Sequence, residues 1–416
     1  MKILKNIVLG IGILVALLCA FILMCAANPN ITESLSSMLA RDGHSREETV
    51  QEEEFKEPFR DEYEWDGSEE EVPLASEESD DMPEVLDDTE ENEYRVQRQP
   101  EDETSPRGSS GARYESSIRG TNGYEPPSES DVKVPEAVSG KSGYQPITEK
   151  SEELPDAEGG EYTSDLGYGE LGDDLSFDPV FYPYYQMLEP KGQHLYRQIF
   201  ANASAMNAEF VPIEAVPVSE IKDVVMAVYN DHPELFWLNT VFVCKYDKNR
   251  ICGELGLEFN MTQEELAEAS TDFYNTTNAL LTEVEHLGTY EKEKRLHDLL
   301  IDRIEYDKGA DMNQSAYSAL VEGKSVCAGY ARAYQYLMQK LGIPCYYCTG
   351  YAGTDHAWNI VALDDGYYNV DLTWDDTPGS EYDYFNRTDQ EYAATHVRQD
   401  LSVNLPQCVG ERYRSQ

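Results

Sequence analysis

Three residue types that together support thiol chemistry follow one another in this chain. Cys327 opens an apolar, alanine-rich stretch in the sequence Gly-Lys-Ser-Val-Cys-Ala-Gly-Tyr-Ala. His356 follows in Asp-His-Ala-Trp-Asn, and Asp371 in Val-Asp-Leu-Thr-Trp-Asp. A cysteine nucleophile needs a base to take its proton and a third group to orient that base. The three residues therefore predict a nucleophile, its base and an orienting carboxylate.

The position of Cys327 favours the reactive form of its side chain. Only the thiolate attacks, and the unperturbed thiol pKa is about 8.5. A helix start lowers that pKa because its free N–H groups and dipole favour the anion, and a nearby imidazole lowers it further. We expect the backbone N–H of Cys327 to face the developing oxyanion, with Tyr317 or Gln314 as the second donor.

The residues alone leave the orienting carboxylate open between Asp371 and Asp375. His356 is predicted to begin a strand, and residues 367–373 to return beside it after the turn Asp364-Asp365-Gly366. If Asp365-Gly366 is a two-residue turn, residue 375 lies opposite His356. Asp371 becomes the partner if the pairing lies nearer the hairpin tip or contains a bulge.

The elements that must hold these residues are predicted within 289–416. A helix runs to about Tyr306, and the Cys327 helix stops at Gly342-Ile343-Pro344, where a glycine cap and a proline end it. Three strands follow, at 345–351, 357–363 and 367–373. This order predicts an α+β fold in which the nucleophile helix packs on an antiparallel sheet.

Residues 179–288 are predicted to form a small α/β extension without a catalytic set of its own. Thr262 and Glu265 form a capping box that opens its last helix. Cys244 and Cys252 flank a predicted hairpin turn, so a cross-strand disulfide is an open possibility outside the cell.

No metal or cofactor is expected. Cys345 and Cys348 lie three apart in a predicted strand and so point to opposite faces, and no second cysteine pair follows at metal-site spacing. His297 and His396 are expected to be structural.

The formal net charge of -48 is spread unevenly. Residues 31–178 hold 44 acidic and 12 basic side chains, with few large apolar residues. Such a span cannot bury enough apolar area to offset its chain entropy, so residues 28–178 are predicted to be a disordered acidic linker. Its acidity serves either as a self-repelling spacer or for solubility alone. Nucleic acid is not expected as a partner, because phosphates would be repelled.

Two short segments of this linker resemble each other. Gly-Tyr-Glu-Pro at 123–126 and Gly-Tyr-Gln-Pro at 143–146 start twenty residues apart. Two copies are too few to predict a repeat architecture.

The first 27 residues are predicted to be a transmembrane anchor. Residues 7–27 are uncharged and long enough to cross a bilayer as a helix. Lys2 and Lys5 precede this run, so the N-terminus is expected in the cytoplasm and the rest of the chain outside the cell. Cleavage after 25–27 would make the protein secreted instead.

The three motifs around Cys327, His356 and Asp371 resemble the signature segments of the transglutaminase-like superfamily. The resemblance covers roughly residues 290–390, and residues 179–288 are similar to the extension of membrane-anchored bacterial members. It implies a papain-like fold with Cys327 as nucleophile, His356 as base and Asp371 as orienter. It also places Trp358 and Trp374 at aromatic motif positions, where they would wall an acyl channel or pack the core. No calcium dependence is implied.

The expected function is acyl transfer through a thioester, on carboxamides or peptide bonds of a protein or peptide substrate at the cell surface. A cysteine protease or amidase of the same fold is the alternative within that chemistry. A non-catalytic surface module that binds peptides or wall polymers is the alternative from another class.

Overall fold

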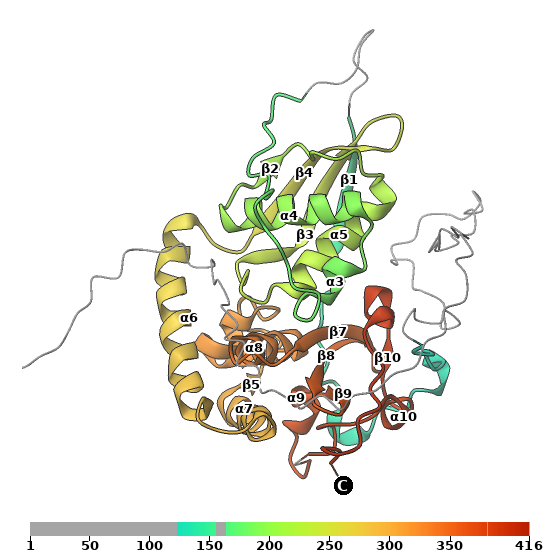
Figure 1. Cartoon of the computed structure of the whole chain (residues 1–416), viewed down its shortest axis with the longest axis vertical. Helices are drawn as coiled ribbons and strands as arrows, with labels where there is room; N and C mark the ends of the chain where they lie inside the picture. Colours follow the sequence, from blue (N-terminus) through green and yellow to red (C-terminus); the bar gives the residue numbers. More distant parts are fainter. Residues whose placement is uncertain (1–122, 155–163, 381, 416) are drawn as a thin grey trace, which may run out of the picture. The chain divides into compact units, whose positions relative to one another are not determined.

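The computed structural model describes residues 123–154, 164–380 and 382–415, which fall within one compact unit, Glu101–Gln416. The predicted anchor at 1–27 and the linker up to residue 122 lie outside the described residues. None of the helices in the described part is long and apolar enough to cross a membrane. The fold is mixed α and β, with two four-stranded sheets (Figure 1).

The first sheet belongs mainly to the predicted extension. Its central hairpin shows alternating burial along the first strand, as expected for a sheet with one covered face. Helix α5 (Val218–Asp231) packs on strand β3 (Leu238–Tyr246), and helix α4 (Pro190–Ser204) packs on α5 (Figure 1). In spatial order the strands are β1 (Thr148–Glu153), β3 (Leu238–Tyr246), β4 (Cys252–Phe259) and β2 (Glu209–Phe210), and the helices are α4 (Pro190–Ser204) and α5 (Val218–Asp231).

The second sheet lies in the predicted catalytic segment and is antiparallel throughout. Its strands are, in spatial order, β10 (Val397–Arg398), β7 (Cys345–Tyr351), β8 (Asp355–Leu363) and β9 (Gly366–Val370). Helix α8 (Cys327–Lys340) packs on β7 and β8, so the nucleophile helix rests on an antiparallel sheet as predicted.

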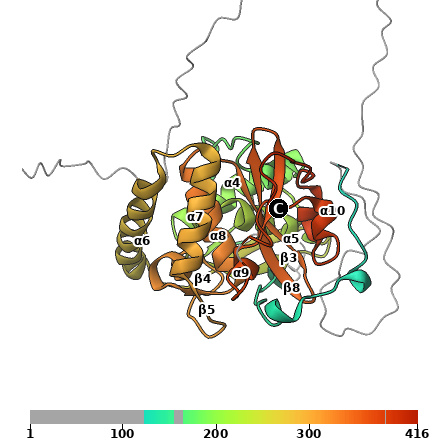
Figure 2. The same ribbon diagram turned by 90° about the horizontal axis from the view of Figure 1, so that it is seen from below.

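Helix α8 is buried on all sides over most of its length. Helix α7 (Thr289–Arg303) packs against α8 and against the one-turn helix α9 (Leu372–Asp375) (Figure 2). On another side of α8, the fully buried Arg332 donates to the backbone carbonyls of Tyr229 and His232, which ties α8 to α5.

The remaining elements connect or cover these layers. They are α3 (Pro183–Gln186), α6 (Gln263–Val284), α10 (Asp389–Tyr392), the short parallel pair β5 (Glu305–Tyr306) and β6 (Lys324–Ser325), the π-helix η3 (Ser318–Glu322), and the 3-10 turns η1 (Glu129–Asp131), η2 (Glu136–Val138) and η4 (Asp400–Asn404). The capping box at Thr262 opens α6 as predicted.

The prediction of a disordered linker is wrong for its described part, residues 123–154 and 164–178. Strand β1 pairs with β3, and Tyr124, Tyr144 and Phe177 are buried. Average composition predicted disorder because these few apolar side chains are diluted among charged ones. They bury against surfaces supplied by distant parts of the chain, which composition does not register.

The cysteines of the described part are all buried and free. The Sγ atoms of Cys244 and Cys252 lie 3.1 Å apart, so the two thiols are in contact without a disulfide bond. Cys345 and Cys348 are both buried, because both faces of β7 are covered.

Candidate active site

Cys327 is the first residue of α8, after an extended N-cap residue, Val326. The chain before it is fixed by the pairing of β6 with β5 and by Ser325, whose hydroxyl donates to the Asn313 carbonyl at 2.8 Å. A Cβ on Gly329 would meet the Ser325 hydroxyl at 1.8 Å, so glycine is required for the first turn to approach this segment. These contacts hold Cys327 at the start of the helix, as predicted.

His356 lies on β8, and its ring contacts Asp371. The Nε2 atom of His356 is 2.8 Å from Oδ2 of Asp371, and both side chains are buried. The Nδ1 atom of His356 is buried without a hydrogen-bond partner of ordinary geometry among the described residues. An ionised carboxylate only accepts, so Nε2 carries the hydrogen and Nδ1 is the nitrogen free to serve the thiol.

The hairpin register explains why Asp371 rather than Asp375 meets His356. Leu363 pairs with Gly366, so the turn is Asp364-Asp365 and lies one residue earlier than the turn considered from the sequence. The strand pairing ends at Val370, and Asp371 caps α9 instead of continuing the strand. Its Oδ1 atom accepts the N–H groups of Thr373 and Trp374, at 3.0 and 3.2 Å.

Asp375 has other partners. Its carboxylate contacts Nε2 of His297 at 3.1 Å, the hydroxyl of Ser380 at 2.9 Å and the backbone N–H of Tyr384 at 2.9 Å. These contacts join α7 to α9 and the segment after it. His297 therefore has the structural position expected of it.

A second histidine lies at the same carboxylate. Nε2 of His396 is 3.2 Å from Oδ2 of Asp371, and its ring stacks on Tyr392 with centroids 4.3 Å apart. Burial lowers the pKa of His396 to about 4, so the ring is neutral and donates its Nε2 hydrogen. The sequence predicted a structural residue, and nothing local in it places His396 beside Asp371.

The electrostatics of Cys327 and His356 favour an ion pair. Burial alone would raise the pKa of Cys327, but the charge and hydrogen bonding of His356, with the N–H groups of Gly143 and Ala357, lower it. Burial likewise disfavours the charged form of His356, but Asp371 and Cys327 outweigh it and raise the pKa of His356 to about 10. Both shifts are in the direction that favours a thiolate–imidazolium pair.

The two side chains predicted as oxyanion donors lie in different places. Tyr317 stacks on Phe236 with centroids 5.1 Å apart and makes no described contact with Cys327, so it is not placed as a donor. Gln314 contacts the main chain of Gly143, the residue whose N–H points at Cys327 Sγ from 3.5 Å. Gln314 is thus the candidate that lies beside the nucleophile.

Trp358 and Trp374 surround the histidines and have no open face. Each is 1 % exposed, and the Trp374 ring centroid lies 5.5 Å from that of His356 and 4.4 Å from that of His396. Trp358 donates its indole N–H to Asn369 at 3.1 Å. The core-packing alternative therefore describes both tryptophans, and neither walls an open channel in this structure.

One cluster in the described part has the composition of a metal site. His356, Asp371 and His396 each offer one possible ligand atom, and these three atoms lie within 4.8 Å of one another. The same atoms serve the hydrogen bonds to Asp371, which need a hydrogen on each Nε2. A metal ion would need the lone pair of that nitrogen, so the two uses exclude each other.

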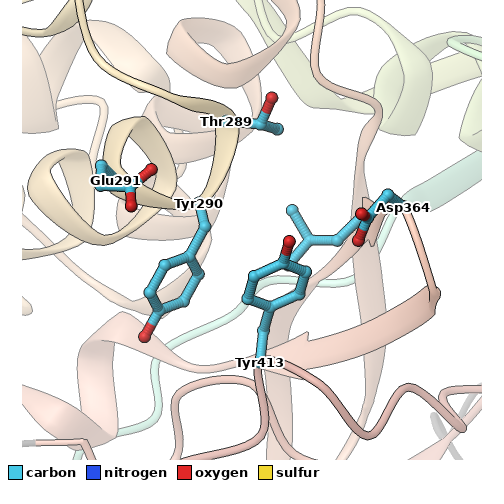
Figure 3. A pocket seen from close by; sticks show the side chains of 6 residues that line it. Thr289, Tyr290, Glu291, Asp364 and Tyr413 are labelled. Atoms are coloured by element: carbon cyan, nitrogen blue, oxygen red, sulfur yellow. The ribbon is translucent and has the colours of Figure 1, made fainter.

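A shallow pocket of about 220 Å³ lies elsewhere, between the start of α7 and the tip of the β8–β9 hairpin (Figure 3). The rings of Tyr290 and Tyr413 stack at its wall with centroids 4.8 Å apart. The lining residues are Thr289, Tyr290, Glu291, Leu363, Asp364 and Tyr413, and none of them belongs to the cysteine site.

The segment that holds this site matches a family model. Residues 278–372, which include Cys327, His356 and Asp371, match the model of the transglutaminase-like superfamily. No curated protein matches the chain.

Two solved structures are similar to parts of the chain. One is a transglutaminase with 14 % identity and a TM-score of 0.24, covering 32 % of this chain and 50 % of its own. The other is a candidate cysteine protease from Cytophaga hutchinsonii with 20 % identity and a TM-score of 0.24, covering 30 % of this chain and 42 % of its own. The chain therefore spans half or less of the length of these two structures. Residues 278–372 of this chain therefore match a transglutaminase-like domain, and Cys327, His356 and Asp371 all lie within the match.

Proposed function

We propose that the protein is a Cys-His-Asp acyl-transfer enzyme that works through a thioester on carboxamide or peptide bonds of a protein or peptide. The observation that carries this proposal is the buried pair of Cys327 and His356 with Asp371 behind it. The pKa of the thiol is lowered and that of the imidazole raised, in the directions that a nucleophile and its acid–base partner require.

The first half of the reaction forms the thioester. The thiolate of Cys327 attacks the carbonyl carbon, and the negative charge moves to the carbonyl oxygen, close to the first N–H groups of α8 and the Gln314 amide. The C–N bond then breaks, and the leaving ammonia or amine takes the Nδ1 proton of His356. Asp371 keeps the ring in the orientation that presents Nδ1.

The second half releases the acyl group. The neutral His356 takes a proton from an incoming amine or water as it attacks the thioester carbon. The C–S bond breaks and the thiolate of Cys327 returns beside an imidazolium. An amine gives a crosslink or a modified side chain, whereas water gives deamidation or peptide hydrolysis.

We propose that this chemistry takes place at the cell surface. The support is the uncharged run at 7–27 with Lys2 and Lys5 before it. Protease digestion of intact cells, followed by detection of fragments after residue 178, tests this placement. The placement would be contradicted if the region after residue 178 stayed uncut in intact cells and was digested only after the cells were lysed.

Active-site labelling tests the reactive pair. We expect Cys327 to be alkylated by iodoacetamide near pH 6–7, where a buried thiol without an ion-pair partner stays protonated, and His356→Ala to abolish this reaction. Equal rates in the wild type and the variant would favour a non-catalytic binding module.

A glutamine-bearing peptide, incubated with and without a labelled primary amine, separates the two outcomes of the thioester. Incorporation of the label supports transfer, and release of ammonia or peptide cleavage without incorporation supports hydrolysis. Cys327→Ala is the control, in which both products should be absent.

A further inference from the structure

A segment from the predicted linker crosses the nucleophile. We call residues 139–147 the strap. On one side it continues into β1, which pairs with β3, and on the other it follows η2, where Val138 packs on Ala352 and Trp374. The strap is therefore held at both ends and passes Cys327 between them.

The main chain of the strap is bound by hydrogen bonds beside Cys327. The N–H of Gly143 points at Cys327 Sγ from 3.5 Å, and its carbonyl accepts from Gln314 Nε2 at 2.9 Å. Gln314 Oε1 accepts the N–H of Gln145 at 2.9 Å. The Gln314 amide thus pairs with a backbone carbonyl and a backbone N–H of the strap, as a neighbouring strand would. Because only main-chain groups take part, this contact would form with an extended peptide of any sequence.

The side chain of Tyr144 fills an apolar site next to the nucleophile. It is 9 % exposed, and its ring meets that of Tyr347 edge-on with centroids 6.3 Å apart. Its hydroxyl is buried without a hydrogen-bond partner of ordinary geometry among the described residues. A phenylalanine would fill the same site without burying an unpaired hydroxyl. The buried residues around the ring are Val326, Cys327, Ala328, Ala331, Tyr347 and Ala357.

The position of Gly143 excludes larger residues. A Cβ there would lie 2.8 Å from Cγ1 of Val326 and 3.4 Å from the hydroxyl of Tyr306. Val326 is buried and β-branched, so it has little freedom to move aside.

We infer that the groove under the strap is the acyl-donor site, and that it takes an extended peptide with glycine at Cys327 and an aromatic side chain, phenylalanine in preference to tyrosine, directly after it. This inference rests on the proposed function. In this structure the strap occupies the groove, and Cys327 is 0 % exposed, so a peptide substrate must displace the strap. The strap presents the N–H of Gly143, and not a carbonyl carbon, to the sulfur of Cys327, so the thiol does not attack the strap.

Alkylation of Cys327 in the full-length protein tests the inference without requiring turnover. The label on Cys327 is followed by peptide mass mapping, because other cysteines are present. Gly143→Ala should raise the rate about tenfold, since the added methyl does not fit while the strap is bound. Tyr144→Ala should raise it as well, because the aromatic anchor is lost.

Two matched variants serve as controls. Gly167→Ala makes the same chemical change at an exposed position where the nearest atom is 3.9 Å from the new Cβ, and it should leave the rate unchanged. Tyr144→Phe keeps the ring and removes the unpaired hydroxyl, so the rate should stay the same or fall. Wild-type rates in both Gly143→Ala and Tyr144→Ala would overturn the inference.

A synthetic peptide with the sequence of residues 141–147 tests the binding preference directly. It should protect Cys327 of the Gly143→Ala protein from alkylation, a phenylalanine version should protect at a lower concentration, and an alanine version at the tyrosine position should not protect. Lack of protection by all three would overturn the inference. If the first two protect but neither a carboxamide nor a peptide bond is ever turned over, the groove stands and the proposed function fails.

Discussion

Asp371 meets His356 from the cap of a helix rather than from within a strand. Its Oδ2 atom lies 2.8 Å from Nε2 of His356, while its Oδ1 atom accepts the N–H groups of Thr373 and Trp374. Burial would raise the pKa of this carboxyl, but the charge and hydrogen bond of His356, together with the hydrogen bond from His396, hold it well below its usual range. One carboxylate thus starts α9 and orients the base.

Replacing Asp371 should therefore damage the base without removing it. In Asp371→Asn the amide cannot stabilise the imidazolium, so the pKa of His356 falls and the thiolate of Cys327 is lost at neutral pH. We expect the rates of Cys327 alkylation at pH 6–7 and of any acyl transfer to fall by about 10²-fold or more.

Asp375→Asn is the matched control, since Asp375 contacts His297 instead. Its Cys327 reactivity should equal that of the wild type, with a loss of about 1–2 kcal/mol in the free energy of unfolding. The assignment of Asp371 would be wrong if the two variants exchanged these results.

The pH dependence of Cys327 alkylation should show a lowered pKa. Because the charge of His356 favours the thiolate, we expect an inflection below the free-thiol value of about 8.5. In His356→Ala the burial of the thiol remains and the positive charge is gone, so the inflection should move above that value. In turnover, the alkaline limb should lie near pH 10, where His356 loses the proton it donates. An inflection that does not differ between the two proteins would contradict the ion pair.

His396 should make the protein sensitive to acid. Burial lowers its pKa from about 6.5 to about 4, so the unfolded chain binds the proton more readily than the native state. The stability that the neutral ring contributes is fully present above pH 6.5 and is lost as the pH falls toward 4, by up to about 3 kcal/mol.

Urea unfolding between pH 7 and 4 measures this effect. His396→Gln keeps an N–H donor but does not titrate, so its free energy of unfolding should fall less steeply with acid than that of the wild type. Equal slopes would show that another group causes the acid sensitivity.

Arg332 should be essential for holding the nucleophile helix against α5. It is fully buried, donates to the carbonyl of His232 at 2.8 Å and lies 3.9 Å from the ring centroid of Tyr229. Arg332→Met removes the side-chain donor from both carbonyls and should lower the free energy of unfolding by about 2–4 kcal/mol in denaturant titrations. Arg295→Met, at a side chain 47 % exposed, should change it by less than about 0.5 kcal/mol.

The local parts of the site were predictable because each depends on neighbours in the chain. The helix start at Cys327, the β8–β9 hairpin and the helix capped at Thr262 follow from periodicity, turn residues and capping patterns. The order of the cysteine, histidine and aspartate motifs was enough to predict the residues that the structure brings together.

The choice between Asp371 and Asp375 needed the tertiary structure. The register of a hairpin depends on which of two adjacent turns forms, and here it is Asp364-Asp365. The end of β9 depends on the packing of α9 against α7 and α8, which no local pattern reports.

The sequence by itself thus determined the candidate residues Cys327 and His356 and the helix and hairpin that carry them, because those are matters of residue type and short-range geometry. Only the tertiary structure decided that His356 and His396 both contact Oδ2 of Asp371, and that the strap lies over Cys327. The physical reason is that each of these contacts joins segments far apart in the chain. Their burial is set by complementary surfaces rather than by local propensity or average composition.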